Sequence, residues 1–182
     1  MEKQKFIDRW PLTARGYLLF LLAIILLFNN SIPVSALSIY MGITLILTGA
    51  AVLYLSFKNY SLASKEFLFH SEGFNDTLTG ILILIFASPS GFATFTIFGV
   101  YAVLTGILKL FQLYYSIRDF YIPNWFLVSI YIVLVLLGVL ILIIPGTSKL
   151  MAYSLIGLYL IIFGVIYLVE SFQPEALKKY SL

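Results

Sequence analysis

The sequence contains one pattern three times: two glycines seven residues apart, within a long apolar stretch that follows a proline. The pairs are Gly42/Gly49, Gly99/Gly106 and Gly157/Gly164, and the preceding prolines are Pro33, Pro89 and Pro145. Successive copies are offset by 57 residues and then by 58. Such a regular period indicates threefold internal duplication, in which each copy is one structural unit that packs against its neighbours.

The glycine pairs have the spacing of one helix face, because seven residues make about two turns of an α-helix. Small residues let helix backbones approach closely in lipid, where packing rather than hydrophobicity drives helix association. The spacing is longer than that of the GxxxG motif, and aliphatic residues stand midway between the glycines. We interpret all six glycines as helix-packing positions. The alternative is that they let helices slide or part around a transport pathway.

The composition places the chain in a membrane. Hydrophobic residues make up 62% of the chain and charged residues only 10%, whereas a soluble domain has about a quarter charged residues. Each proline divides its copy into two apolar runs, which gives six spans near residues 12–28, 35–57, 72–88, 92–116, 124–144 and 150–172. The predicted fold is an all-α integral membrane protein. Six transmembrane helices form three tandem helical hairpins around a pseudo-threefold axis, with repeats at approximately 12–57, 72–116 and 124–172.

Two of the spans are less apolar than the others. The strictly apolar part of the first covers only residues 16–28, so a full-length span requires that Arg15 snorkels to the interface and that the helix starts near Pro11. A basic N-terminus, this short apolar core and a Val34-Ser35-Ala36 sequence also fit a cleavable signal peptide, which stays an alternative. The third span is polar in its first turns, at Glu72, Asn75, Asp76, Thr77 and Thr79.

The distribution of charge predicts the orientation. Ten of the eleven Lys and Arg residues and all eight acidic residues fall on the side of the two termini and the longer linkers. Only Lys149 lies at a hairpin tip. The positive-inside rule then predicts a multi-pass protein of the cell membrane with both termini in the cytoplasm and the proline-bearing tips outside.

Polar groups near the cytoplasmic ends of three spans form a candidate site. Glu72 and Asp76 share one face of the third helix, Lys109 lies about 10 Å inside the fourth span, and Gln112 follows on the same side. Glu170 stands near the end of the sixth span. We hypothesise that Lys109 pairs with Glu170 or Asp76 in an inward-facing polar pocket, because buried charges in a membrane pair. Alternatively, Lys109 snorkels, Asp76 caps the third helix, and Glu170 lies among the headgroups.

The residue inventory gives no support for catalysis. The chain has no cysteine and a single histidine, His70, in the linker at 58–71. It contains no hydrolase, zinc-protease or nucleotide-binding motif. We therefore expect no enzymatic activity, no cofactor, no metal site and no nucleic-acid partner. The expected partner is the lipid bilayer, and a homo-oligomer or another membrane protein remains open. His70 is expected to be a solvated loop residue, and pH sensing is the alternative.

The segments GILILIFASP and FGVYAVLTGILKL, LLGVLILIIP and IGLYLIIFGVIYL, and the weaker SIP…MGITLILTGAAVLY resemble the HdeD-like family of small membrane proteins. The resemblance covers nearly the whole chain. It implies a helical membrane fold, a role in acid resistance, in another stress response or in membrane integrity, and no catalytic residues. Two other functions stay open: a small transporter or channel with an inward-facing polar pocket, and a membrane scaffold on which partner helices dock.

Overall fold

The computed structural model is all-helical over the residues it describes, which are 2–28, 32–58, 63–87, 91–117, 125–143 and 149–172. Side chains are described within these ranges for residues 13–28, 32–54, 71–87, 91–114, 125–143 and 150–169. The helices are α1 (Glu2–Phe28), α2 (Val34–Lys58), α3 (Ala63–Ile85), α4 (Phe92–Ile117), α5 (Trp125–Ile143) and α6 (Lys149–Phe172). The predicted helical class is therefore confirmed, and each of the six predicted segments overlaps one helix.

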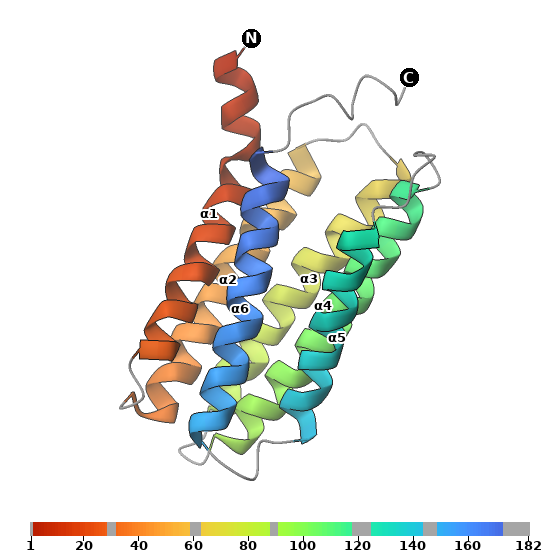
Figure 1. Ribbon diagram of the computed structural model, residues 1–182. Coiled ribbons are helices and arrows are strands. Elements are labelled where there is room, and N and C mark those ends of the chain that lie inside the picture. The colour runs from red at the N-terminus through yellow and green to blue at the C-terminus, as the bar shows by residue number, and fades with distance from the viewer. Residues whose placement is uncertain are drawn as a thin grey trace.

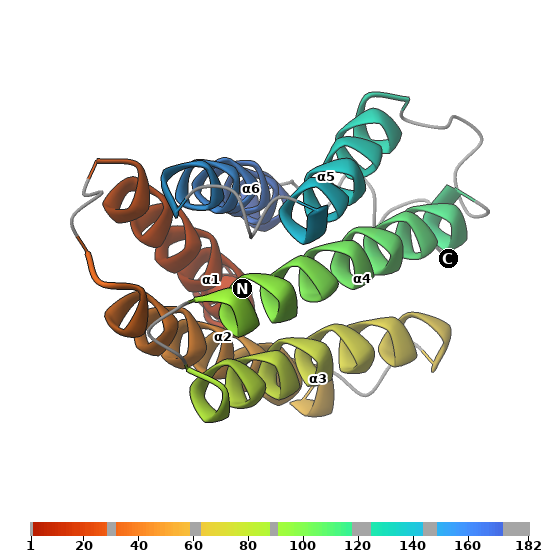
Figure 2. The same ribbon diagram turned by 90° about the horizontal axis from the view of Figure 1, so that it is seen from below.

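The helices form a closed ring in chain order. Each packs against the helix before it and the helix after it, and α6 returns to pack against α1 (Figures 1 and 2). The start of α1 and the end of α6 lie at the same end of the bundle (Figure 1). The closest packing joins α2 to α3, α4 to α5 and α6 to α1. These pairs join helices of different copies, so the repeats associate with one another more extensively than the two helices of a single hairpin do.

The chain reverses direction within a hairpin at the turns before α2 and α4. Pro33 precedes α2, and its carbonyl accepts a hydrogen bond from the Leu37 amide at 3.1 Å. Gly91 precedes α4 with a φ of +72°, a conformation that side chains disfavour. A Cβ atom at this position would also lie 2.4 Å from Val34 Cγ1. The second turn therefore requires glycine at position 91 on both conformational and steric grounds.

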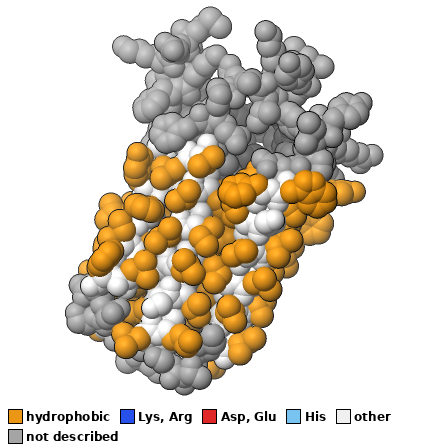
Figure 3. Space-filling view, viewed as in Figure 1, with side chains coloured by type: hydrophobic (Ala, Val, Ile, Leu, Met, Phe, Trp, Pro, Cys, Tyr) orange, Lys and Arg blue, Asp and Glu red, His pale blue; other side chains and the backbone are white. Residues whose placement is uncertain are grey.

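Within the described residues, four helices are long and apolar enough to cross a membrane, through the segments Val34–Tyr54, Phe92–Tyr114, Trp125–Ile143 and Leu150–Val169. Over the described side chains, α1 contains a shorter apolar segment, Thr13–Phe28, and α3 is not among the candidate spans. Hydrophobic side chains cover the face seen in Figure 3, where no charged side chain is visible among those that are coloured. The four candidate spans indicate a membrane-embedded protein, and α1 and α3 lie alongside them in the same ring.

Two helix starts differ from the prediction. Helix α1 begins at Glu2 and continues through Pro11 instead of starting there. Helix α3 begins at Ala63, nine residues before the predicted start, so most of the expected linker is helical. Asp76 consequently lies well inside α3, and its predicted alternative role as an N-terminal cap is wrong.

All six repeat glycines lie at the interfaces between copies. Gly42 and Gly49 of α2 face α3, Gly99 and Gly106 of α4 face α5, and Gly157 and Gly164 of α6 face α1. A Cβ atom added at Gly49 would come within 2.7 Å of the Thr77 amide nitrogen, and one at Gly164 within 3.1 Å of the Gly16 carbonyl oxygen. Several partners on the facing helices are also glycines: Gly16, Gly73, Gly80 and Gly138. The close approach of these backbones explains why small residues recur here.

Aromatic side chains fill much of the interior between α4 and α6. The ring of Phe98 meets that of Tyr159 edge-on with centroids 5.6 Å apart, and Phe163 meets Tyr167 in the same way at 4.7 Å. The Tyr159 and Phe163 rings are 5.5 Å apart, so these contacts form a continuous series along α6. This aromatic series ends at Tyr167, where a group of charged side chains begins.

Candidate functional site: a buried charge cluster

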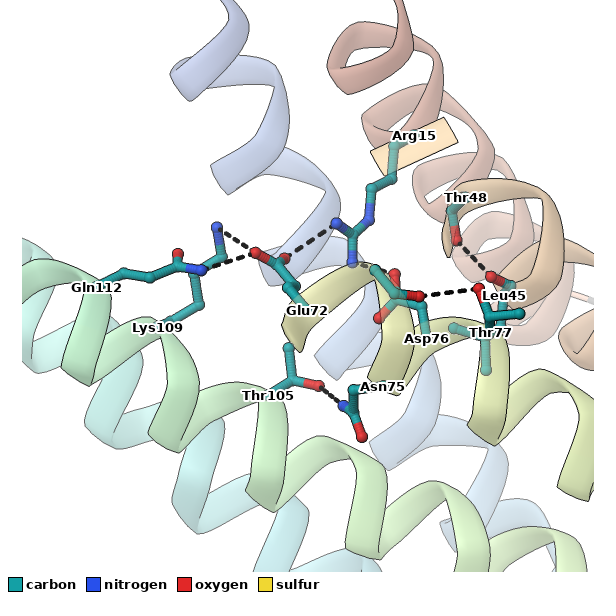
Figure 4. A network of polar contacts seen from close by, with 11 residues as sticks. Arg15, Leu45, Thr48, Glu72, Asn75, Asp76, Thr77, Thr105, Lys109 and Gln112 are labelled. Carbon is teal, nitrogen blue, oxygen red and sulfur yellow. Dashed lines mark hydrogen bonds and ion pairs between the residues drawn. The ribbon is translucent and has the colours of Figure 1, made fainter. Parts of the chain in front are cut away.

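Four charged side chains from three helices lie together inside the bundle (Figure 4). They are Arg15 of α1, Glu72 and Asp76 of α3, and Lys109 of α4, and each is at most 2% exposed. We call this group the charge cluster. Isolated charges at such positions are costly in a membrane, and they occur where partners neutralise them.

Arg15 joins α1 to α3. Its Nη1 donates to Oε1 of Glu72 at 3.0 Å, and its Nη2 donates to Oδ2 of Asp76. Glu72 and Asp76 are one helical turn apart, so both carboxylates face the same side of α3. The planar, forked guanidinium group can bind two carboxylates at once, which the single ammonium of lysine cannot do in the same geometry.

Glu72 extends the connection from α3 to α4. Its second oxygen, Oε2, accepts a hydrogen bond from Gln112 Nε2 at 3.0 Å and lies 3.6 Å from Lys109 Nζ. One turn further along, Asn75 Nδ2 donates to Thr105 Oγ1 at 3.1 Å. Glu72 therefore contacts polar groups of both α1 and α4.

Helix α6 contributes an aromatic ring to the cluster. The ring centroid of Tyr167 is 4.0 Å from Arg15 Cζ and 4.5 Å from Lys109 Nζ. The ring of Phe163 is 5.7 Å from the same guanidinium carbon. Cation–π contacts of this kind stabilise by about 2 kcal/mol when the cation is desolvated. Four of the six helices thus meet at the charge cluster.

The cluster is balanced in formal charge, with two cations and two carboxylates. Removing one partner of a buried ion pair leaves an uncompensated charge, which is far more costly than the pair itself is stabilising. No group of three or more His, Cys, Asp or Glu residues that could hold a metal ion occurs among the residues with described positions. The arrangement can hold helices together and can exchange protons at its carboxylates.

The predicted site residues are largely brought together. Glu72, Asp76, Lys109 and Gln112 all take part in the charge cluster, and Lys109 is buried rather than snorkelling. Lys109 forms an ion pair with Glu72, a partner that the sequence did not predict, and the predicted pairing of Lys109 with Asp76 or Glu170 stays a prediction. The side chains of Glu170 and His70 lie outside the described residues, and the roles predicted for these side chains stay predictions. The backbone of His70 lies within α3, so its predicted position in a loop is wrong.

Arg15 is the residue that the sequence reasoning missed. It was expected to snorkel to the interface, yet it is 1% exposed and holds both carboxylates. A signal was present, because Glu72 follows Arg15 by 57 residues, the offset between the first two copies. The two residues therefore occupy equivalent positions on α1 and α3. Tyr167 follows Lys109 by 58 residues, the offset between the second and third copies, so this pair is also equivalent.

Comparison with known proteins agrees with the threefold repeat. A family model described as a short repeat of unknown function, DUF308, matches residues 14–74, 71–132 and 130–181. The chain belongs to the DUF308 family. The HdeD proteins that the sequence resembles belong to DUF308 as well. Neither a curated protein nor a solved structure matches the chain significantly. The first two DUF308 matches run from the first helix of one copy into the first helix of the next, and so include a close interface between copies.

Proposed function

We propose that this chain is a non-enzymatic, multi-pass protein of the cell membrane that acts in a stress response, as the resemblance to HdeD proteins implies. In this proposal the charge cluster holds the helix ring closed and releases it when a carboxylate takes up a proton. The observation that carries the proposal is the contact of one buried guanidinium, that of Arg15, with both Glu72 and Asp76.

The direction of the pH response follows from the charge balance. Asp76 is surrounded by Arg15 on α1, Glu72 on its own helix, Lys109 and Tyr101 on α4, and Tyr159 on α6. A proton on either carboxyl group leaves the cluster with a net charge of +1 and weakens the attraction that holds Arg15. Acidification therefore loosens the docking of α1 on α3, and a return to neutral pH restores it.

The proposal includes six spans rather than four. The charges that make α1 and α3 look too polar are paired with each other, and both helices pack along neighbours that are clear spans. Both termini then face the cytoplasm. Cysteines introduced singly at Ser90 and Thr147 should react with an impermeant maleimide applied to intact cells, whereas one at Ser64 should not. The reverse labelling pattern would contradict this orientation.

A pH titration of the distance between α1 and α3 tests the release directly. Spin labels at the exposed positions Leu21 and Leu78, introduced as cysteines into this cysteine-free chain, should give one distance at neutral pH in nanodiscs. A longer distance should gain population as the pH falls. The Glu72→Gln variant should show the longer distance already at neutral pH. A distance that does not change with pH in either protein would overturn the proposed release.

A small transporter is a second candidate, because ionisable groups inside a bundle often mark ion pathways. The buried aromatic series from Phe98 to Tyr167 argues against a continuous polar path along the bundle. Proteoliposomes with a pH gradient distinguish the two. If the charge cluster only holds the helix ring closed, we expect no protein-dependent proton flux. A flux that Lys109→Met abolishes would favour transport.

A further inference from the structure

Four polar atoms of the charge cluster and its neighbours are buried without a well-formed hydrogen bond. They are Arg15 Nε, Asp76 Oδ1, the Tyr101 hydroxyl and the Tyr167 hydroxyl, as judged over the part of the chain that the structure describes. All four side chains are at most 1% exposed. An unsatisfied buried polar group loses its hydrogen bonds to water without replacing them, so four at one place require an explanation.

The four atoms belong to side chains that surround one guanidinium group. Asp76 uses its other oxygen to bind Arg15, and the Tyr167 ring lies 4.0 Å from Arg15 Cζ. The Tyr101 hydroxyl interacts with both Arg15 and Asp76, electrostatically and through hydrogen bonds whose geometry is too poor to satisfy the hydroxyl. The unpaired atoms therefore come from α1, α3, α4 and α6 and meet where these four helices join.

Their hydrogen-bonding capacities are complementary to those of water. Arg15 Nε only donates, Asp76 Oδ1 accepts, and each tyrosine hydroxyl can do both. A buried water typically makes about three hydrogen bonds to otherwise unsatisfied groups. A metal cation would be repelled by Arg15 and Lys109, and an anion by Asp76 and Glu72, so a small neutral molecule suits this site best.

We propose that this junction is an internal hydration site, in which ordered water links Asp76 Oδ1 to Arg15 Nε and the hydroxyls of Tyr101 and Tyr167. Arg15 lies 13 residues before Phe28, the end of α1, which is about 20 Å along the helix. The water is thus held inside the bundle, away from the tip end. This water could also deliver the proton that Asp76 takes up on acidification; that role rests on the proposed function, whereas the hydration site itself does not.

X-ray radiolytic labelling of the full chain in nanodiscs, read by mass spectrometry, tests the site. Hydroxyl radicals form from water and react before diffusing far, so a buried side chain is oxidised only where water is held beside it. Tyr101 and Tyr167 should be oxidised at neutral pH several-fold faster than Phe95, which is 2% exposed in the apolar core. Oxidation of both tyrosines at the slow rate of Phe95 would overturn the hydration site.

A variant separates bound water from intrinsic reactivity. Tyr167→Phe removes one hydroxyl that holds the water but keeps the ring beside Arg15 and Lys109, so the fold should be retained. Oxidation of Tyr101 should then fall, with Phe95 unchanged. An unchanged rate at Tyr101 would contradict the shared site. Labelling at neutral pH together with a pH-insensitive distance between α1 and α3 would keep the hydration site and reject the proposed release.

Discussion

The glycine-lined interfaces and the charge cluster use the threefold repeat in opposite ways. At the interfaces, each copy presents the same chemistry to the next: Gly42 faces Gly80, Gly99 faces α5, and Gly164 faces Gly16. In the cluster, equivalent positions carry different residues. Arg15 and Glu72 are equivalent positions, and the third copy has Ile130 there. The repeated glycines form the similar interfaces of the ring, whereas the different residues at equivalent positions form a single asymmetric site.

The comparison also separates two kinds of stabilisation. The interfaces depend on backbone approach, which a single added methyl group disturbs. The cluster depends on charge balance, which a single added methyl group does not affect but the loss of one charge destroys. Substitutions at the two places should therefore differ in how much they lower the free energy of unfolding and in which second substitution can restore it.

Arg15→Met should give the largest effect. It removes the partner of two buried carboxylates, and the loss of one member of a buried ion pair costs about 3–5 kcal/mol. The free energy of unfolding in bicelles, measured by SDS titration, should fall by that amount. Leu21→Met at an exposed position of α1 is the control and should change little. A loss below about 1 kcal/mol, the size expected of an exposed pair, would mean that the cluster is not buried.

Gly80→Ala should come next. The added Cβ would lie 2.7 Å from the Gly42 carbonyl oxygen and 2.9 Å from the Ile46 amide nitrogen. Because these backbone atoms cannot move independently, we expect a loss of about 1–3 kcal/mol in the same unfolding assay.

Gly157→Ala, in the equivalent interface between α6 and α1, is the matched control. Its added Cβ would meet mainly the end of the flexible Leu27 side chain, with the nearest backbone atom 3.6 Å away. Alanine also favours a helix over glycine by about 1 kcal/mol, so the change should be close to neutral. Equal losses at Gly80 and Gly157 would contradict backbone approach as the reason for glycine.

Thr105→Val should give the smallest effect. It removes the acceptor of the Asn75 hydrogen bond between α3 and α4, a loss of about 1 kcal/mol. Thr44→Val is its control, because that hydroxyl bonds only to the Tyr40 carbonyl within its own helix among the contacts described. An equal change at both positions would show that the Asn75–Thr105 bond adds nothing to the packing of α3 on α4.

Much of the fold follows from the sequence, because the glycine period and the prolines place six helices. Hydropathy underestimates how well α1 and α3 fit inside the helix ring, for one reason. Hydropathy counts each charge separately, but Arg15, Glu72 and Asp76 neutralise one another only after the chain has folded. The ring closure of α6 on α1 and the close packing between copies also depend on tertiary contacts that no local pattern encodes.

The candidate site was partly predictable. Helical spacing puts Glu72 and Asp76 on one face, and the depth of Lys109 in its span indicates a paired charge. The choice of partner was not predictable, since it depends on which helices meet. Arg15 stands at the start of an apolar run, where snorkelling is the usual behaviour. Aligning the copies by their offset would have paired it with Glu72.

The most direct test of the central claim is whether Asp76→Asn restores the stability lost in Arg15→Met. The double variant keeps Lys109 and Glu72, which lie 3.6 Å apart, and returns the cluster to zero net charge. We predict that its free energy of unfolding recovers most of the loss caused by Arg15→Met alone, so that the two substitutions are strongly non-additive. A double variant as unstable as the sum of the two single losses would contradict charge balance as the basis of the cluster.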